Sequence, residues 1–322
     1  MIPNNRTAGK VKILVLAGGI SHERDISLKS GRRVADALTE AGATVIIHEP
    51  DSSLLTNIKK EEPDVIFPVL HGASGEDGAL REILALTGIP VVGATAQGAR
   101  LAWDKSIAKI LVEKTGIQTP PSITLPKDTF RELDAEQVLK LVGSAHALPV
   151  VVKPARSGSA QGVTVVRKAE QLSRAMVDAY VYCDVAIIEK FVEGTELAVS
   201  VIDLGAGPMA LPPVEIEPVG GEYGYQERYT AGETNYFVPA RLSKTVIDRA
   251  TKMAVDAHIA LGLRHLSRID MIVDKKGTPW FLEANVLPGL TETSLFPQAV
   301  IANGNTLSEV YLGLVTATLR GR

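Results

Sequence analysis

Residues 280–297 read WFLEANVLPGLTETSLFP, and residues 267–274, a short distance before them, read SRIDMIVD. Residues 267–274 and the start of the later segment carry the apolar side chains Ile, Met, Val, Trp and Phe, as is typical of β-strands, and the KKG at 275–277 forms a polar turn. We therefore predict two successive strands. Glu283 and Asn285 are two residues apart in the second strand, so they share one of its faces.

Three oxygen donors gather on these strands, because Asp270 of the first accompanies Glu283 and Asn285 of the second. Hard oxygen ligands suit Mg²⁺, which commonly links protein carboxylates to phosphates. Arg268 lies two residues before Asp270 on the same face, where a cation can stabilise negative charge that develops on a substrate. The alternative is an ordinary surface hairpin, since acidic and amide residues are common in turns.

The strand is expected to end soon after Asn285, because Pro288 and Gly289 follow it. Residues 291–294 then offer hydroxyl groups at a point where a helix can begin. The first turn of a helix has free backbone N–H groups, so this segment is a natural place to hold a carboxylate.

Composition limits the classes of function. The chain has 322 residues, enough for two or three domains, and its 45% hydrophobic and 22% charged content is ordinary for a globular protein. A net charge of −3 gives no electrostatic footprint for nucleic acid, and no apolar stretch reaches the ~20 residues of a membrane span. The single Cys183 fits a reducing compartment, and no signal-peptide pattern follows the first residues. We expect a cytoplasmic protein that binds neither nucleic acid nor membrane.

The first hundred residues alternate apolar strand patterns with a helical pattern, which predicts an open parallel α/β domain. The expected strands are 11–17, 44–48 and 65–70. Glu23 follows the first strand and His71 the third, and open α/β sheets bind ligands at the carboxyl ends of their strands. We therefore expect both side chains at a substrate site, although a lone histidine is often structural. A dinucleotide site is disfavoured because the first turn lacks GxGxxG.

The middle of the chain contains a helix at 102–115, with Lys105 inside it, and a proline-rich linker that marks a domain boundary. A strand at 149–153 then leads into KPARSGSAQGV, a loop of glycines and small residues. Such a loop exposes backbone N–H groups that can close over phosphates, with Lys153 at its base. The alternative is a plain flexible hairpin.

Two further segments suggest binding. A strand at 185–191 ends in Glu189 and Lys190, and the short hinge before the next strand, which carries Glu196, could hold an adenine through the backbone. Residues 220–237 read GGEYGYQERYTAGETNYF, too polar for a core and too aromatic for a linker. Such a loop can act as a lid or as an oligomer contact.

Taken together, these motifs resemble the D-alanine–D-alanine ligases of the ATP-grasp superfamily. The matching pieces occur in the family's order over nearly the whole chain: AGGISHERDISLKSG, HGASGEDGAL, WDK, VVVKPARSGSAQGV, IIEKFVEGTE, ERYTAGETNYFVPA, SRIDMIVD and LEANVLPGLTETSLFP. The resemblance implies a three-domain α/β architecture of the ATP-grasp type. Its parts would be an N-terminal open parallel α/β domain at 1–104, a central ATP-grasp subdomain at 105–192, and a C-terminal subdomain at 193–322 with the lid and the metal site.

The resemblance also implies roles for single residues. Glu23 is similar to the glutamate that binds the ammonium of the first D-alanine, with Ser159 and Tyr229 as its hydrogen-bonded partners. Arg268 and the backbone N–H of Gly289 resemble the oxyanion donors. The pocket for the carboxylate of the second D-alanine would be formed by Ser294 and Leu295.

The implied cofactors are ATP and two Mg²⁺ ions, with Mn²⁺ as a possible replacement. The metal ligands would be Asp270, Glu283 and Asn285. The positions that resemble ATP contacts are Lys105, Lys153, Ser157, Gly158, Glu189, Lys190, Val192, Glu196 and Arg228. Ser157 replaces a glutamate that relatives commonly have, and Arg228 a lysine, so the grip on the nucleotide departs from the family pattern.

The function implied by the resemblance is ligation of two D-alanines through an acyl phosphate, for peptidoglycan precursor synthesis, by a homodimer. A carboxylate and the γ-phosphate are both anions, so cations must bring them together. Two alternatives stay open. One is a related ligase that makes a D-alanyl ester or a specialised amide, and the other is a nucleotide-binding module without catalysis.

Overall fold

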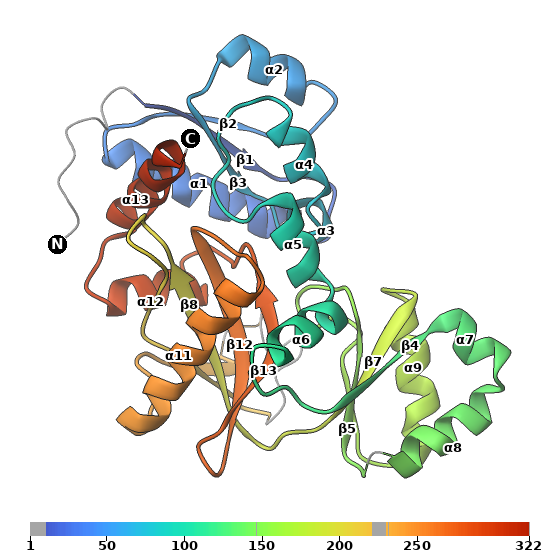
Figure 1. Cartoon of the computed structure of the whole chain (residues 1–322). Coiled ribbons are helices and arrows are strands. Elements are labelled where there is room, and N and C mark those ends of the chain that lie inside the picture. Colours follow the sequence, from blue (N-terminus) through green and yellow to red (C-terminus); the bar gives the residue numbers. More distant parts are fainter. Residues whose placement is uncertain (1–10, 146, 221–229, 231, 322) are drawn as a thin grey trace.

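The computed structural model describes residues 11–145, 147–220, 230 and 232–321 (Figure 1). Within these residues the strands form one parallel sheet and two antiparallel sheets, so the predicted α/β class is confirmed. None of the described helices is both long and apolar enough to cross a bilayer. The division of the chain after residues 104 and 192 remains a prediction.

The N-terminal sheet has the order β2-β1-β3 and is parallel, as the alternating pattern predicted. Its elements are β1 (Lys12–Ala17), α1 (Arg24–Glu40), β2 (Thr44–His48), α2 (Leu54–Glu61), β3 (Val65–Val69), α3 (Ala73–Glu76) and α4 (Ala79–Ala85). All five residues of β3 are buried, because α1 and the C-terminal helix α13 (Leu307–Arg320) cover one face of the sheet while α2 and α4 cover the other. Glu23 follows the carboxyl end of β1 and His71 that of β3, and both residues line one cavity.

The C-terminal sheet is antiparallel, with the order β11-β10-β8-β12-β13 and β9 beside β8. Its elements are β8 (Gly194–Ile202), β9 (Met209–Ala210), β10 (Val214–Pro218), β11 (Thr234–Phe237), α11 (Lys244–Ala260), β12 (Leu266–Asp274), β13 (Pro279–Asn285) and α12 (Leu295–Ala302). One face packs under α11, with Ile269, Met271 and Phe281 in that core. The intervening side chains of β12 and β13 point to the opposite face.

The central sheet, β4-β7-β5-β6, is also antiparallel and lies apart from the other two (Figure 1). Its elements are β4 (Ser122–Pro126), α7 (Lys127–Glu132), α8 (Ala135–Ala145), β5 (Val150–Pro154), β6 (Thr164–Val166), α9 (Leu172–Tyr180) and β7 (Val185–Lys190), with a short 3₁₀ turn at Ala169–Gln171. Val150 and Val152 of β5 pack under α9, whereas Val151 and Lys153 point the other way and line a cavity.

The single helix expected at 102–115 is two helices in the structure, α5 (Ala96–Trp103) and α6 (Lys105–Glu113). Asp104 separates them with an extended backbone, and its side chain accepts the N–H groups of Ser106 and Ile107. The prediction was wrong because Asp104 caps the start of a second helix. The apolar periodicity of the sequence does not show where a capping residue divides a helix in two. Because α6 begins at Lys105, this lysine points toward the loop that follows β5 of the central sheet.

A clasp between distant segments joins the N-terminal and C-terminal parts. Arg264 donates to the carbonyls of Gly93 at 2.8 Å and Val91 at 3.1 Å, and the Gly93 N–H donates to His265 Nδ1 at 2.9 Å. His265 is buried, and burial together with the nearby charge of Arg264 lowers its pKa to about 4. The clasp therefore contains an imidazole that is neutral at pH 7.

This clasp predicts a specific loss of stability in acid. The unfolded histidine has a pKa near 6.5, above the native value of about 4, so unfolding takes up a proton between these pH values. The free energy of unfolding should therefore fall as pH drops from 6.5 to 4, by about 1.4 kcal/mol per pH unit from this residue. Urea unfolding of His265→Asn, measured at several pH values, should show a free energy of unfolding that changes less steeply with pH, by that amount.

Asparagine is the suitable replacement, because it tolerates the left-handed backbone of His265 (φ 65°) and its Oδ1 can accept the same N–H group. Wild-type and variant curves that run parallel from pH 7 to 4.5 would contradict the assignment.

Candidate active site

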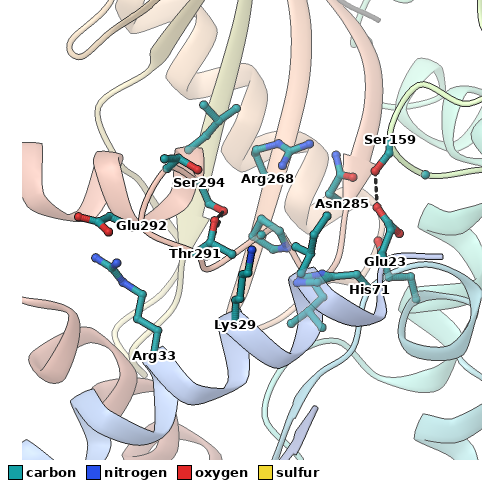
Figure 2. A pocket seen from close by; sticks show the side chains of 18 of the residues that line it. Glu23, Lys29, Arg33, His71, Ser159, Arg268, Asn285, Thr291, Glu292 and Ser294 are labelled. Atoms are coloured by element: carbon teal, nitrogen blue, oxygen red, sulfur yellow. Dashed lines mark hydrogen bonds between the residues drawn. The ribbon is translucent and has the colours of Figure 1, made fainter. Parts of the chain in front are cut away.

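Two neighbouring cavities hold the predicted site residues that the structure describes. We call the first, of about 660 Å³, the Glu23 cavity (Figure 2). The predicted residues that line it are Glu23, His71, Gly158, Ser159, Arg268, Asn285, Gly289, Ser294 and Leu295. They come from all three parts of the chain, although Gly158 was expected among the nucleotide contacts.

We call the second cavity, of about 470 Å³, the Lys153 cavity; the central and C-terminal sheets flank it. The predicted residues that line it are Lys105, Lys153, Ser157, Glu189, Lys190, Val192, Glu196, Asp270 and Glu283. Tyr229 and Arg228 lie outside the described residues, as does most of the loop expected to form a lid.

The wall between the cavities is the polar face of β12 and β13. Arg268 pairs in register with Asn285, and Asp270 with Glu283, with a bulge directly after Asp270. Arg268 donates twice to the Asp270 carboxylate, each time at 2.7 Å, and Asn285 Nδ2 donates to the same carboxylate at 3.0 Å. Asp270 and Glu283 face the Lys153 cavity, while Arg268 and Asn285 face the Glu23 cavity.

The corner around Glu23 joins two parts of the chain. The Ser159 hydroxyl donates to Glu23 Oε1 across 136 residues, and Glu23 lies at the N-cap position of α1 (Figure 2). Ser159 and Ala160 have left-handed backbones, with φ of 53° and 56°. Non-glycine residues adopt this conformation at a cost, and such strain is concentrated at functional sites. The turn directs the Ser159 side chain toward the carboxylate.

His71 acts as a buried brace beside this corner. Its Nε2 lies 3.2 Å from Ser30 Oγ, which also accepts the Leu290 N–H at 3.3 Å, and the ring makes a backbone hydrogen bond with Leu287. Burial lowers the pKa of His71, so the ring is held neutral. These contacts fix the segment after β13 against α1.

Glu76 is a site residue that the sequence reasoning missed, although it lies within the HGASGEDGAL motif. It lines the Glu23 cavity, is buried, and accepts the Gly72 N–H at 2.9 Å. Burial, with a smaller contribution from Glu23, raises its pKa to about 8. Glu76 is therefore mostly protonated at neutral pH.

The far end of the Glu23 cavity is the start of α12. Ser294 is its N-cap residue, and Ser294 Oγ lies 2.7 Å from Thr291 Oγ1 and accepts the Thr291 N–H at 3.0 Å. A Cβ on Gly289 would come within 2.7 Å of Ser294 Oγ, so this close approach requires glycine. Lys29 and Arg33 of α1 reach toward the same end (Figure 2).

Lysines dominate the inner end of the Lys153 cavity. Lys105 Nζ donates to the Ser157 carbonyl at 2.7 Å and lies 3.1 Å from Glu283 Oε2. Lys153 Nζ lies 2.6 Å from Glu189 Oε1. Burial alone would raise the pKa of Glu189, but Lys153 and a second lysine, Lys109, outweigh it and lower the pKa.

Lys109 was missed by the sequence reasoning. Its Nζ lies 2.8 Å from Glu189 Oε2 and donates to the Pro120 carbonyl at 2.7 Å. The available signal was its spacing of four residues from Lys105, which places both lysines on one side of a helix.

The chemistry of the donor set at the wall fits a divalent cation. Asp270 and Glu283 are carboxylates and Asn285 adds an amide oxygen, all hard donors of the kind that Mg²⁺ prefers. Arg268 and Lys105 pair with these two carboxylates, so a bound cation would share their oxygens with both side chains.

Comparisons with known proteins match nearly the whole chain to one family. Two family models, described as "D-ala D-ala ligase N-terminus" and "D-ala D-ala ligase C-terminus", match residues 43–94 and 111–316. A D-alanine–D-alanine ligase of Pelotomaculum thermopropionicum is 37% identical over 91% of this chain and 92% of its own length.

Two solved structures share the fold over nearly their whole length. One is D-alanine–D-alanine ligase from Bacillus anthracis complexed with ATP, with TM-score 0.81 and 26% identity over 97% of this chain and 98% of that one. The other is VanG D-Ala:D-Ser ligase from Enterococcus faecalis, with TM-score 0.81 and 28% identity over 96% and 99%. A match of this extent in both sequence and structure places the chain in the D-alanine–D-alanine ligase family of ATP-grasp proteins.

Proposed function

We propose that this protein uses ATP to join two D-alanines into D-alanyl-D-alanine through an acyl phosphate, a step in peptidoglycan precursor synthesis. The observation that carries the proposal is the shared wall of β12 and β13. It separates a cavity lined by Glu23, Ser159 and Ser294 from a cavity lined by Lys105, Lys153 and Glu189. Arg268 and Asp270 are in contact between the two.

The first D-alanine binds in the Glu23 cavity, with its ammonium on Glu23 and its carboxylate toward Arg268. The Ser159 hydroxyl supports this orientation by holding the Glu23 carboxylate in place. The substrate carboxylate then points across the wall toward the Lys153 cavity, where the γ-phosphate would lie. Such placement converts a reaction between two anions into one within a fixed geometry.

ATP binds in the Lys153 cavity. Lys105 and Lys153 support its phosphates, and the segment from Glu189 to Glu196 supports the adenosine. Asp270, Glu283 and Asn285 would hold the two Mg²⁺ ions, or Mn²⁺ in their place, and bound magnesium neutralises phosphate charge. Lys105, Lys153 and the backbone N–H groups of residues 157–160 would help to neutralise the same phosphate charge.

The second D-alanine enters at the start of α12, with its carboxylate toward Ser294 and Leu295. Its free amine attacks the acyl carbon, the carbon–nitrogen bond forms, and phosphate leaves with the electron pair of the broken carbon–oxygen bond. Arg268 and the Gly289 N–H are suited to stabilise the intervening oxyanion, because both line the cavity there. A homodimer, a cytoplasmic location and a lid formed around Tyr229 belong to the proposal as expectations.

An amide with a different second amino acid is the second candidate, which the likeness to a D-Ala:D-Ser ligase favours. The deciding experiment is a phosphate-release assay with D-alanine alone, and then with D-alanine plus D-serine or D-lactate, with products resolved by mass. D-alanyl-D-alanine should dominate. A main product containing D-serine or D-lactate would replace the proposal with the specialised amide or the ester.

Replacing Arg268 should slow catalysis more than it weakens binding. Arg268→Ala should lower kcat by about 10²–10³, the usual effect of removing an oxyanion donor, with a much smaller change in KM for D-alanine. Arg268→Lys is the matched control, because it keeps the charge but cannot form the two parallel bonds to Asp270. It should recover only part of the rate. A variant that changes KM alone would make Arg268 a ground-state binder.

Binding of the first D-alanine at pH 7 should release a proton. Glu76, with a pKa of about 8, is mostly protonated at this pH, and an ammonium beside it favours the ionised form. Calorimetry in buffers of different ionisation enthalpy measures the proton count directly. Release should approach one proton in the wild type and vanish in Glu76→Gln. Equal release by both proteins would assign the proton to another group.

A further inference from the structure

A buried group of three charges lies at the inner end of the Lys153 cavity. Glu189 uses one carboxylate oxygen for Lys153, at 2.6 Å, and the other for Lys109, at 2.8 Å. Lys153 and Glu189 line the cavity, and Lys109 reaches the carboxylate from α6. Lys109 and Glu189 are each only 3% exposed, so solvent screens their interaction little.

The sum of the charges in this group decides what the buried corner around Lys153 presents to a ligand. Lys153 and Glu189 alone would form a neutral pair, whereas the charge of Lys109 leaves the group with one net positive charge. Charges interact more strongly where the effective dielectric constant is low. One unit of net positive charge therefore attracts an anionic ligand more strongly here than it would at the surface. The lysines lower the pKa of Glu189, so its carboxylate is ionised. Burial lowers the pKa of Lys109, but the Glu189 carboxylate at 2.8 Å opposes this effect and favours the charged ammonium.

The position of Lys109 is firmly set. Besides Glu189, its ammonium donates to the Pro120 carbonyl at 2.7 Å, just before the chain enters the central sheet. The flanking helix residues Ala108 and Val112 belong to the core under the C-terminal sheet. Lys109 thus holds Glu189 of the central sheet from a helix that is anchored in the C-terminal core.

We propose that Lys109 is a positioning residue for nucleotide binding. It balances the charge of Glu189 and fixes its carboxylate, so that Lys153 presents an uncancelled positive charge to the phosphates of the nucleotide. This inference rests on the proposed function, which puts ATP in the Lys153 cavity.

The test compares ligands that differ in phosphate number. Calorimetry should show that Lys109→Met weakens ADP and ATP by roughly 10- to 100-fold, as expected for losing an interaction with a charged group, and adenosine by less than about threefold. Lys114→Met is the matched control, because Lys114 is an exposed lysine at the end of the same helix. It should bind all three ligands as the wild type does. Equal losses for adenosine and ATP would reduce Lys109 to structural support and overturn the proposal.

A double variant separates charge balance from general damage. Lys109→Met with Glu189→Gln removes one charge of each sign and again leaves Lys153 uncancelled, so the ratio of ADP affinity to adenosine affinity should be higher than in Lys109→Met alone. A ratio no higher than that of the single variant would refute the charge argument.

Circular dichroism checks that each variant is folded. If Lys109→Met does not fold, Lys109→Gln carries the same expectation, because it keeps a donor for the Pro120 carbonyl. Failure of the wild type to bind ATP would instead overturn the proposed function.

Discussion

The antiparallel pairing of β12 with β13 is the constraint on which the rest of the structure depends. Its register sets Asp270 opposite Glu283 and Arg268 opposite Asn285, so these four polar side chains are neighbours on the sheet. Apolar residues of the same strands face the core under α11. Because one sheet both fills a core and forms the wall between two cavities, the site is as rigid as the sheet.

Charge pairing explains how so many ionised groups are tolerated in one place. Burying an isolated charge is costly, but here Asp270 pairs with Arg268, Glu283 with Lys105, and Glu189 with two lysines. Glu76 differs from these groups, because burial and the nearby carboxylate raise its pKa, so it is largely protonated at neutral pH. The protein thus pairs these lysines and Arg268 with its own carboxylates, and anionic phosphates can compete for the same cations.

The N-terminal part of the chain completes the site by packing against the C-terminal part. One continuous core contains residues of β1, β3 and α1 together with residues of α12 and α13. The clasp of Arg264 and His265 on residues 91–93 adds polar contacts at the same junction. This junction positions Glu23 and His71 beside the wall formed by β12 and β13. A substitution that loosens the junction should therefore also disturb the first amino-acid site.

Local pattern in the sequence determined the strands, the parallel N-terminal sheet and the shared face of Arg268 and Asp270, because side-chain alternation depends only on neighbouring residues. The order of the motifs indicated the family. The resemblance to the family implied that Ser159 is a partner of Glu23, and the Ser159 hydroxyl donates to that carboxylate. The tertiary structure alone decided that Gly158 lines the Glu23 cavity and that Lys109 and Glu76 belong to the site. These facts depend on burial and on contacts between distant segments, such as Lys109 and Glu189, which lie 80 residues apart, and such contacts arise only when separately folded elements pack together.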